Sequence, residues 1–297
     1  MLDESLISDK IKQIKFDHLN GSSQIARDAL NLLKLFVNTS KTTTCTKFKE
    51  DFKEIGICLL NARPNMAPVQ NLVAQVVYEV NSRKEIDFVF LKNFTMSLLS
   101  TLIKQSEISI QETAKQATVI IPDSGCLATC SYSSTVCESL RKAKKQGKHF
   151  KVVVAESKVG TTSYGMLLAH SLEKLNIAVK VFRDNQILKY VKDVKCVLVG
   201  VDSLLYDGSI INGSPTGELA VEAKQSKVPF YSVCETTKAN ILSYLGKKIK
   251  LMRGFDVVSS NLITGIITEK GLLNSDKLAE VMKEKSIFFE ILDVNSH

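Results

Sequence analysis

The hydrophobic periodicity of this chain changes near Thr118, and this change limits the folds that the chain can adopt. From Ser5 to about Lys115, apolar residues recur at spacings of three and four, which is typical of amphipathic helices. Beyond that point, short β-branched runs alternate with amphipathic segments. We therefore expect a helical N-terminal domain over residues 1–116 and an α/β domain over residues 117–297.

The predicted α/β domain is a Rossmann-like, doubly wound parallel sheet, because strands that are apolar on both faces need helices on both sides. The predicted strands are Thr118–Ile121, Lys151–Ala155, Ala178–Phe182, Cys196–Val201, Phe230–Val233 and Leu262–Thr268. The predicted helices between them are Ser134–Gln146, Tyr164–Lys174, Asn185–Val191, Gly217–Gln225 and Asp276–Lys285. The helices predicted in the N-terminal domain are Gln24–Phe36, Phe48–Leu59, Val69–Val80, Ile86–Lys104 and Ile110–Gln116.

Ligands of such sheets bind beyond the carboxyl ends of the strands. The polar loops that begin at Pro122, Glu156, Asp202 and Glu235 are therefore the places where a site is expected. No GxGxxG or GxxxxGK[ST] sequence follows a strand, so a conventional dinucleotide or Walker-type site is not predicted.

Composition excludes several classes of protein. A hydrophobic content of 44% with 24% charged residues is that of a globular chain, and the apolar stretches are too short to cross a bilayer. We expect a cytoplasmic protein with no membrane association. The seven cysteines form no CxxC pair and there are only four histidines, so neither a disulfide framework nor a metal site is expected, and no cofactor is predicted.

The net charge of +8 suits a phosphorylated ligand, an acidic protein or a nucleic acid. Direct RNA binding is disfavoured, because the chain contains no RNA-binding motif. The lysine-rich run between Arg141 and Lys151 is better explained as a solvated helix end.

Two short segments have the chemistry of an anion site. Residues Asn20 to Ser23 open a predicted helix, where free backbone N–H groups and the helix dipole favour an anion, although an ordinary helix cap is the alternative. Arg63 precedes Pro64 and would place a fork of donors at a helix end, with a helix-terminating ion pair as the alternative.

Seven segments, in order along nearly the whole chain, resemble those of initiation factor 2B related proteins. This family contains regulatory translation factor subunits together with methylthioribose-1-phosphate and ribose-1,5-bisphosphate isomerases. The segments are NGSSQIARDAL from Asn20, NARPNMAPVQN from Asn61, TCSYSSTV from Thr129, VVAESKVGTTSYG from Val153, VLVGVDSLLYDGSIINGSPTGELA from Val197, VPFYSVCETTK from Val228 and NLITGIITEKG from Asn261.

The resemblance implies a phosphorylated sugar or nucleotide in a cleft between the two domains. The family enzymes use an Asp and a Cys to move a proton between neighbouring carbons, and Asp202 stands at the position of the Asp. Cys130 lies one residue before the position of the family cysteine, which Ser131 occupies. The ligand-binding residues that the resemblance implies are Asn20, Gly21, Ser22, Ser23, Arg63, Ser133, Ser134, Asn212 and Lys238.

Three other residues depart from the pattern of the isomerases, and two of them remove a positive charge. Asn20 replaces an Arg, Gly213 replaces a Lys, and Pro215 replaces a Gly. Loss of these cationic groups favours a regulatory or translation-initiation protein that binds the ligand. The alternative is an aldose–ketose isomerase of a 1-phosphorylated ribose that uses Asp202 and Cys130. A homodimer through the C-terminal domain is expected by resemblance, and other initiation-factor subunits are further partners that it allows.

Overall fold

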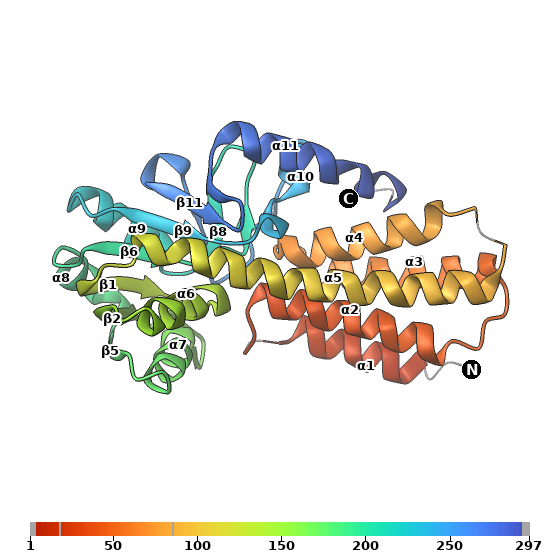
Figure 1. Ribbon diagram of the computed structural model, residues 1–297, viewed down its shortest axis with the longest axis horizontal. Coiled ribbons are helices and arrows are strands. Elements are labelled where there is room, and N and C mark those ends of the chain that lie inside the picture. Colours follow the sequence, from red (N-terminus) through yellow and green to blue (C-terminus); the bar gives the residue numbers. More distant parts are fainter. Residues whose placement is uncertain (1–3, 18, 85, 293–297) are drawn as a thin grey trace.

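The computed structural model describes residues 4–17, 19–84 and 86–292. The molecule is elongated, with a helical bundle at one end and a helix-covered sheet at the other (Figure 1). One long helix, α5 (Phe88–Ala117), extends from the bundle to the sheet (Figure 1). The remaining helices of the bundle are α1 (Glu4–Lys15), α2 (Ser22–Thr39), α3 (Cys45–Ala62) and α4 (Ala67–Ser82).

The bundle core is aromatic at the end that lies far from the sheet. The ring centroid of Phe36 lies 5.6 Å from that of Phe48 and 6.0 Å from that of Phe52. Phe88 closes this cluster at the start of α5, where Asp87 caps the helix by accepting from the N–H groups of Val89 and Phe90.

Helix α5 corrects one prediction, because the segments 86–104 and 110–116 belong to a single helix. The five residues between them, QSEIS, contain neither Gly nor Pro, and nothing in them stops a helix that has already begun. The polar residues there are tolerated because they lie along one continuous, partly exposed helix.

The main sheet has seven strands in the order β12-β11-β9-β6-β1-β2-β5. All neighbouring pairs are parallel except β11 and β12. The strands are β1 (Ser124–Cys130), β2 (His149–Ala155), β5 (Ala178–Phe182), β6 (Cys196–Val199), β9 (Phe230–Val233), β11 (Gly265–Thr268) and β12 (Gly271–Leu273).

Helices cover both faces of this sheet, so the predicted doubly wound α/β class is confirmed. On one face, Leu127 and Val152 share a core with side chains of α6 (Ser134–Lys145) and α7 (Tyr164–Glu173). On the other face, Ala128 and Val153 share a core with side chains of α8 (Ile187–Val191) and α9 (Thr216–Gln225). The alternation of these neighbours across the sheet follows from the two-residue period of a strand.

Shorter elements complete the fold. Two small sheets are formed by β10 (Phe255–Val258), β8 (Ile210–Gly213) and β7 (Ser203–Leu204), and by β3 (Lys158–Val159) and β4 (Thr162–Ser163). The other helices are η1 (Thr118–Ile120), η2 (Asp184–Gln186), η3 (Thr236–Lys238), α10 (Ile241–Tyr244), η4 (Ser260–Leu262), α11 (Ser275–Ser286) and η5 (Ile287–Leu292).

The predicted strand Thr118–Ile121 is wrong. These residues form the single turn η1 and its end, with Val119 80% exposed, and the strand begins later, at Ser124. The β-branched residues mimic a strand, whereas β1 has the sequence SGCLATC, whose small residues give little strand signal. The loop at Pro122 therefore precedes β1, and the loop at the carboxyl end of β1 begins at Ser131.

The strand order places a topological switch point between β1 and β6. The chain passes from β1 outward to β2 and β5, then crosses to β6 and continues outward on the other side to β9 and β11. The loops that follow β1 and β6 consequently leave in opposite directions, which opens the crevice where doubly wound sheets bind ligands.

Contacts between the bundle and the sheet are extensive. Helix α5 packs against α6, and η5 returns to α4, where the ring centroids of Phe288 and Tyr78 are 5.6 Å apart. The division at residues 116 and 117 stays a prediction about domain organisation.

Candidate ligand site at the switch point

Two helix N-termini meet beside the switch point. Gly21 precedes α2, and a side-chain carbon there would lie 3.8 Å from Oγ and 3.9 Å from the backbone nitrogen of Ser134, the first residue of α6. The N-cap residue of α2 is Gly21 itself, which has no side chain with which to cap the helix. The N–H groups and dipoles of both helices therefore favour negative charge at this junction.

The loop after β6 packs closely against the start of α6. A side-chain carbon at Gly200 would lie 2.5 Å from Oγ of Ser133, so no larger residue fits without displacing that serine. Ser133 also caps α6, because its hydroxyl accepts from the N–H of Val136 at 3.3 Å. Of the hydroxyls predicted to bind ligand, Ser133 is therefore already used locally.

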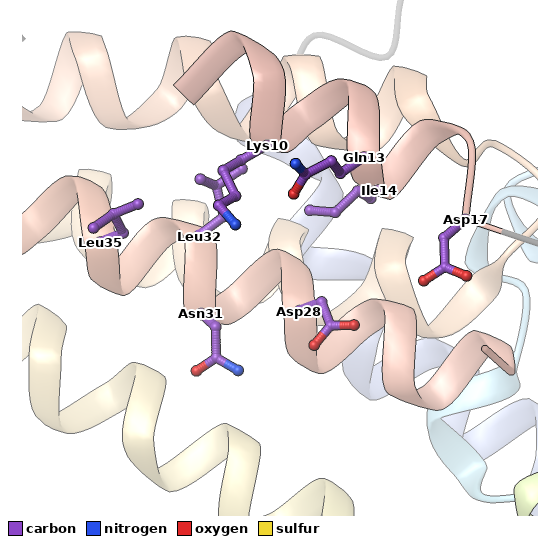
Figure 2. Close-up of a pocket in the computed structure, with 8 residues that line it drawn as sticks. All are labelled: Lys10, Gln13, Ile14, Asp17, Asp28, Asn31, Leu32 and Leu35. Carbon is purple, nitrogen blue, oxygen red and sulfur yellow. The ribbon is translucent and has the colours of Figure 1, made fainter. Parts of the chain in front are cut away.

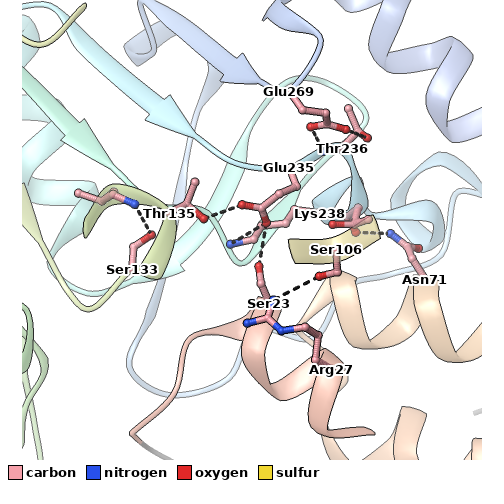
Figure 3. Close-up of polar contacts among 12 residues, drawn as sticks. Ser23, Arg27, Asn71, Ser106, Ser133, Thr135, Glu235, Thr236, Lys238 and Glu269 are labelled. Atoms are coloured by element: carbon pink, nitrogen blue, oxygen red, sulfur yellow. Dashed lines mark hydrogen bonds and ion pairs between the residues drawn. The ribbon is translucent and has the colours of Figure 1, made fainter. Parts of the chain in front are cut away.

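Glu235 joins the helical bundle to the sheet (Figure 3). Its carboxylate, in a side chain that is 1% exposed, accepts from Ser23 Oγ of α2 at 2.8 Å and from Thr135 Oγ1 of α6 at 2.5 Å. Lys238 Nζ lies 3.9 Å from the same carboxylate. Glu235 thus fixes the relative positions of both helix starts and of a buried ammonium group.

Asp202 lies between the expected binding groups. Burial raises the pKa of its carboxyl, while Lys238, the nearby Ser22 hydroxyl and Arg63 act to lower it, in that order. The loop itself is held by the backbone, since the N–H of Asp202 donates to Ile211 and its carbonyl accepts from Ala67. The structure therefore brings three of the expected residues around one carboxyl.

Ser22 is near enough to Asp202 for its hydroxyl to lower the pKa of that carboxyl. Its Oγ is buried and has no close hydrogen-bond partner among the residues that the structure describes. The Asp202 carboxyl is therefore the neighbour that this hydroxyl faces, and a ligand oxygen there would offer it a hydrogen bond of better geometry.

Arg63 has fewer free hydrogen-bond donors for a ligand than its sequence position suggested. Its Nε donates to the carbonyl of Ile14 at 2.8 Å, and one terminal nitrogen donates to the carbonyl of Asp17. Its side chain is buried, and burial lowers its pKa. Two of the three guanidinium nitrogens therefore anchor the end of α1 and the turn after it. Neither alternative drawn from the sequence had included this role. Contact of Arg63 with a ligand stays a proposal.

Asn20 also makes a local contact. It is exposed, and its amide donates to the Asp17 carboxylate at 2.8 Å, which closes the turn before α2. The structure gives Asn20 a role in shaping that turn.

Cys130 is the last residue of β1, beside the switch point, and is buried. Its Sγ lies 3.1 Å from Oγ1 of Thr216, and burial raises the pKa of the thiol to about 12. Thr216 donates its own proton to the carbonyl of Gly213, so the thiol is the donor to Thr216. Asn212 also donates its amide to Thr216, at 2.9 Å. At neutral pH this cysteine is a protonated, hydrogen-bonded group and a poor base.

Ser131 occupies the space beside Gly213. A side-chain carbon at Gly213 would lie 2.7 Å from Ser131 Oγ, so a longer residue there would collide with this serine. Ser131 has a φ of 59°, and its N–H donates to Ser157 Oγ at 2.7 Å, which stabilises the uncommon backbone. The residue types at positions 131 and 213 are therefore sterically linked.

A cavity of about 310 Å³ lies between α1 and α2 (Figure 2). Among the described residues that line it are two carboxylates, those of Asp17 and Asp28, and one cation, Lys10. This lining does not favour a phosphate, so the crevice at Asp202 and Lys238 remains the better candidate for an anion.

Within residues 4–17, 19–84 and 86–292, no three His, Cys, Asp or Glu side chains are placed to hold a metal ion. Over the same residues, no helix combines the length and apolar character needed to span a bilayer.

The residues that sequence reasoning missed are Glu235, Thr135 and Thr216. Glu235 had a visible signal, because it lies two residues after the end of β9, at the start of a polar loop where a site was expected. Thr135 and Thr216 had none, since a hydroxyl at the first turn of a helix is commonplace and its partner depends on the tertiary fold.

These features define a Rossmann-like α/β protein in which two helix starts and buried cationic groups lie beside the switch point of the sheet. The model of the initiation factor 2 subunit family matches residues 18–254, and the chain belongs to this family.

Two relatives from archaea carry different names. A translation initiation factor eIF-2B subunit 2-like protein of Pyrococcus furiosus is 28% identical over 286 residues, covering 92% of this chain and 98% of the relative. A ribose 1,5-bisphosphate isomerase of Methanocaldococcus jannaschii is 25% identical over 294 residues, covering 92% of this chain and 93% of the relative.

Among solved structures, the tetrameric eIF2B-beta2-delta2 complex from C. thermophilum contains a similar chain, with a TM-score of 0.79 and 18% identity. The match covers 95% of each chain, and at this identity it shows the common fold.

Proposed function

We propose that this protein binds a phosphorylated sugar or nucleotide in the crevice between bundle and sheet, with a regulatory or translation-initiation role in the cytoplasm. The observation that carries the proposal is the meeting of the α2 and α6 starts beside the buried ammonium of Lys238. A phosphate is the group that such an arrangement of N–H donors and positive charge favours.

Asp202 supports a phosphorylated ligand with hydroxyl groups. Because burial raises its pKa, a nearby phosphate would favour its protonated form further. A protonated carboxyl donates to a phosphate oxygen, and an ionised one accepts from a sugar hydroxyl. Either form gives this residue a role in binding that requires no proton transfer to carbon.

The buried thiol favours binding over catalysis. An isomerase that used Cys130 would need a thiolate or another mobile proton acceptor, and this thiol instead donates to Thr216. The alternative function, isomerisation of a 1-phosphorylated ribose, draws its support from the raised pKa of Asp202, which suits a general acid.

Isothermal titration tests the proposal with ribose 1,5-bisphosphate and AMP against ribose and adenosine as phosphate-free controls. We expect both phosphorylated compounds to bind and both controls to give no heat at the same millimolar concentration. Equal binding of ribose and ribose 1,5-bisphosphate would refute the phosphate site. Turnover of ribose 1,5-bisphosphate that Asp202→Asn abolishes would instead favour the isomerase.

A homodimer through the C-terminal domain is the proposed assembly. β10 is an edge strand of its sheet, Val257 on it is 51% exposed, and Met252 shortly before it is 42% exposed. Such apolar groups at a strand edge are suited to a partner surface. Other subunits of initiation-factor complexes are the proposed hetero-partners, in line with the assembly named for the similar solved chain.

Light scattering should give the mass of two chains, and Val257→Glu should shift it toward one chain, because a buried charge opposes association. The exposed Val119, which lies in η1, supplies the control Val119→Glu, and this change should leave the mass unaltered. A wild-type monomer at micromolar concentration would contradict the dimer.

A further inference from the structure

A second cavity, here called the η3 pocket, lies where α4, α5, η3 and α11 meet. Its volume is about 260 Å³, just below the range of roughly 300–1,000 Å³ typical of pockets for drug-sized ligands. The residues that define it here are Leu72, Gln105, Ser109, Thr237, Glu269 and Lys285. None of these residues belongs to the predicted site at the switch point.

Two opposite charges face this pocket without pairing directly. Lys285, on α11, forms no ion pair within 4.0 Å among the described residues, although Glu269 is close enough to act on its pKa. Burial is the main influence on Lys285 and lowers the pKa of its ammonium group. A partly buried cation and a nearby anion therefore line the same space and leave a gap between them.

Glu269 is held in place by η3. Its carboxylate accepts from the backbone N–H of Thr236 at 3.0 Å and from the hydroxyl of the same residue (Figure 3). Each carboxylate oxygen has a further lone pair, so Glu269 can still accept from a ligand donor. Its position is fixed before any ligand enters, which lowers the cost of ordering the site.

The other walls of the η3 pocket divide into polar and apolar parts. The side chains of Gln105, Ser109 and Thr237 make no hydrogen bond to a described residue and remain available. Leu72 and Leu102 supply an apolar wall and are each 4% exposed. A ligand here meets one cation, one anion, a few neutral donors and acceptors, and a small hydrocarbon surface.

The charges discriminate between classes of ligand. A simple anion gains attraction from Lys285 and meets repulsion from Glu269, and a simple cation meets the reverse. A molecule that carries both charges satisfies both residues at once. The small volume limits such a molecule to about the size of a single amino acid.

We propose that the η3 pocket binds a small zwitterion of the α-amino-acid class, with its carboxylate on Lys285, its ammonium group on Glu269 and an aliphatic side chain against Leu72 and Leu102. The proposal does not depend on a phosphorylated ligand at the switch point. The two places share η3, because Thr236 contacts Glu269 on one side while Lys238 contacts Glu235 on the other.

Titration of the full-length protein with L-leucine tests this assignment, with two analogues that each lack one charge. These are 4-methylpentanoate, without the ammonium group, and 3-methylbutylamine, without the carboxylate. We expect L-leucine to bind and each analogue to bind at least about tenfold more weakly, because hydrogen bonds to charged groups contribute about 1.5–3 kcal/mol. L-alanine and L-valine should bind as well, with less apolar contact.

The variants Lys285→Met and Glu269→Gln should each weaken L-leucine binding about tenfold or more, while Lys283→Met, at an exposed position on the same helix, should leave it unchanged. If a variant melts early, the comparison of the three ligands on wild-type protein decides alone. The proposal fails if none of L-alanine, L-valine and L-leucine binds at millimolar concentration. It also fails if 4-methylpentanoate binds as tightly as L-leucine, which would indicate a plain anion site.

Discussion

Glu235→Leu is expected to destabilise the protein by about 3–5 kcal/mol, the usual consequence of removing one partner from a buried ion pair. Lys238, which is 4% exposed, would lose the carboxylate 3.9 Å from its ammonium group. The hydroxyls of Ser23 and Thr135 would lose their acceptor at the same time. Single domains are stable by about 5–15 kcal/mol, so this loss is a large fraction of the total.

Urea denaturation followed by circular dichroism measures this effect as a fall in the midpoint concentration. Leucine is chosen because it keeps most of the side-chain volume and so limits the contribution of a cavity. Glu218→Leu, at an exposed position in α9, is the matched control and should change stability by less than about 0.5 kcal/mol. A Glu235→Leu midpoint equal to that of Glu218→Leu would show that the Glu235 contacts contribute nothing.

The network around Glu235 explains why such a charged group is retained in the interior. A buried ion pair is a weak source of stability, but its directional hydrogen bonds fix geometry. Here they hold Ser23 at the start of α2 and Thr135 at the start of α6 against the same carboxylate (Figure 3). The relative placement of the two helix N-termini therefore depends on one residue that comes from neither helix.

The sequence predicts a strand well where the residues of that strand themselves favour β structure. The strands Ala178–Phe182 and Phe230–Val233 have the predicted bounds, because each is a short segment in which β-branched or aromatic residues predominate. The prediction fails at β1, where four buried positions carry Leu, Ala, Thr and Cys. Burial there is imposed by neighbouring strands, and the residues themselves indicate it weakly.

The candidate site is predictable in location and only partly in its contacts. Parallel strands direct their following loops to one edge, so Asp202 could be placed there from the sequence alone. The partners of Arg63 could not, because they are the carbonyls of Ile14 and Asp17, and every residue has a carbonyl. The protonation of Cys130 likewise depends on the burial that the tertiary fold imposes.

Lys238→Met is expected to weaken binding of ribose 1,5-bisphosphate or AMP by roughly 30-fold to several thousand-fold. Removing one partner of a buried charge pair costs about 2–5 kcal/mol, and each 1.4 kcal/mol is a factor of ten in affinity. The proposed phosphate would lose the ammonium group nearest to both Asp202 and Glu235. Methionine retains the unbranched chain and thus the packing of the lysine stem.

The same titration on three variants separates charge from folding. Lys238→Arg keeps a positive charge and should retain more affinity than Lys238→Met, while Lys248→Met, at an exposed position beyond α10, should bind as wild type does. Melting curves establish that each variant is folded at the assay temperature. Because the helix N-termini of α2 and α6 remain in Lys238→Met, residual binding that still requires the phosphate is expected. Full affinity in Lys238→Met would show that the anion binds away from Lys238, and this result would contradict the proposed ligand site.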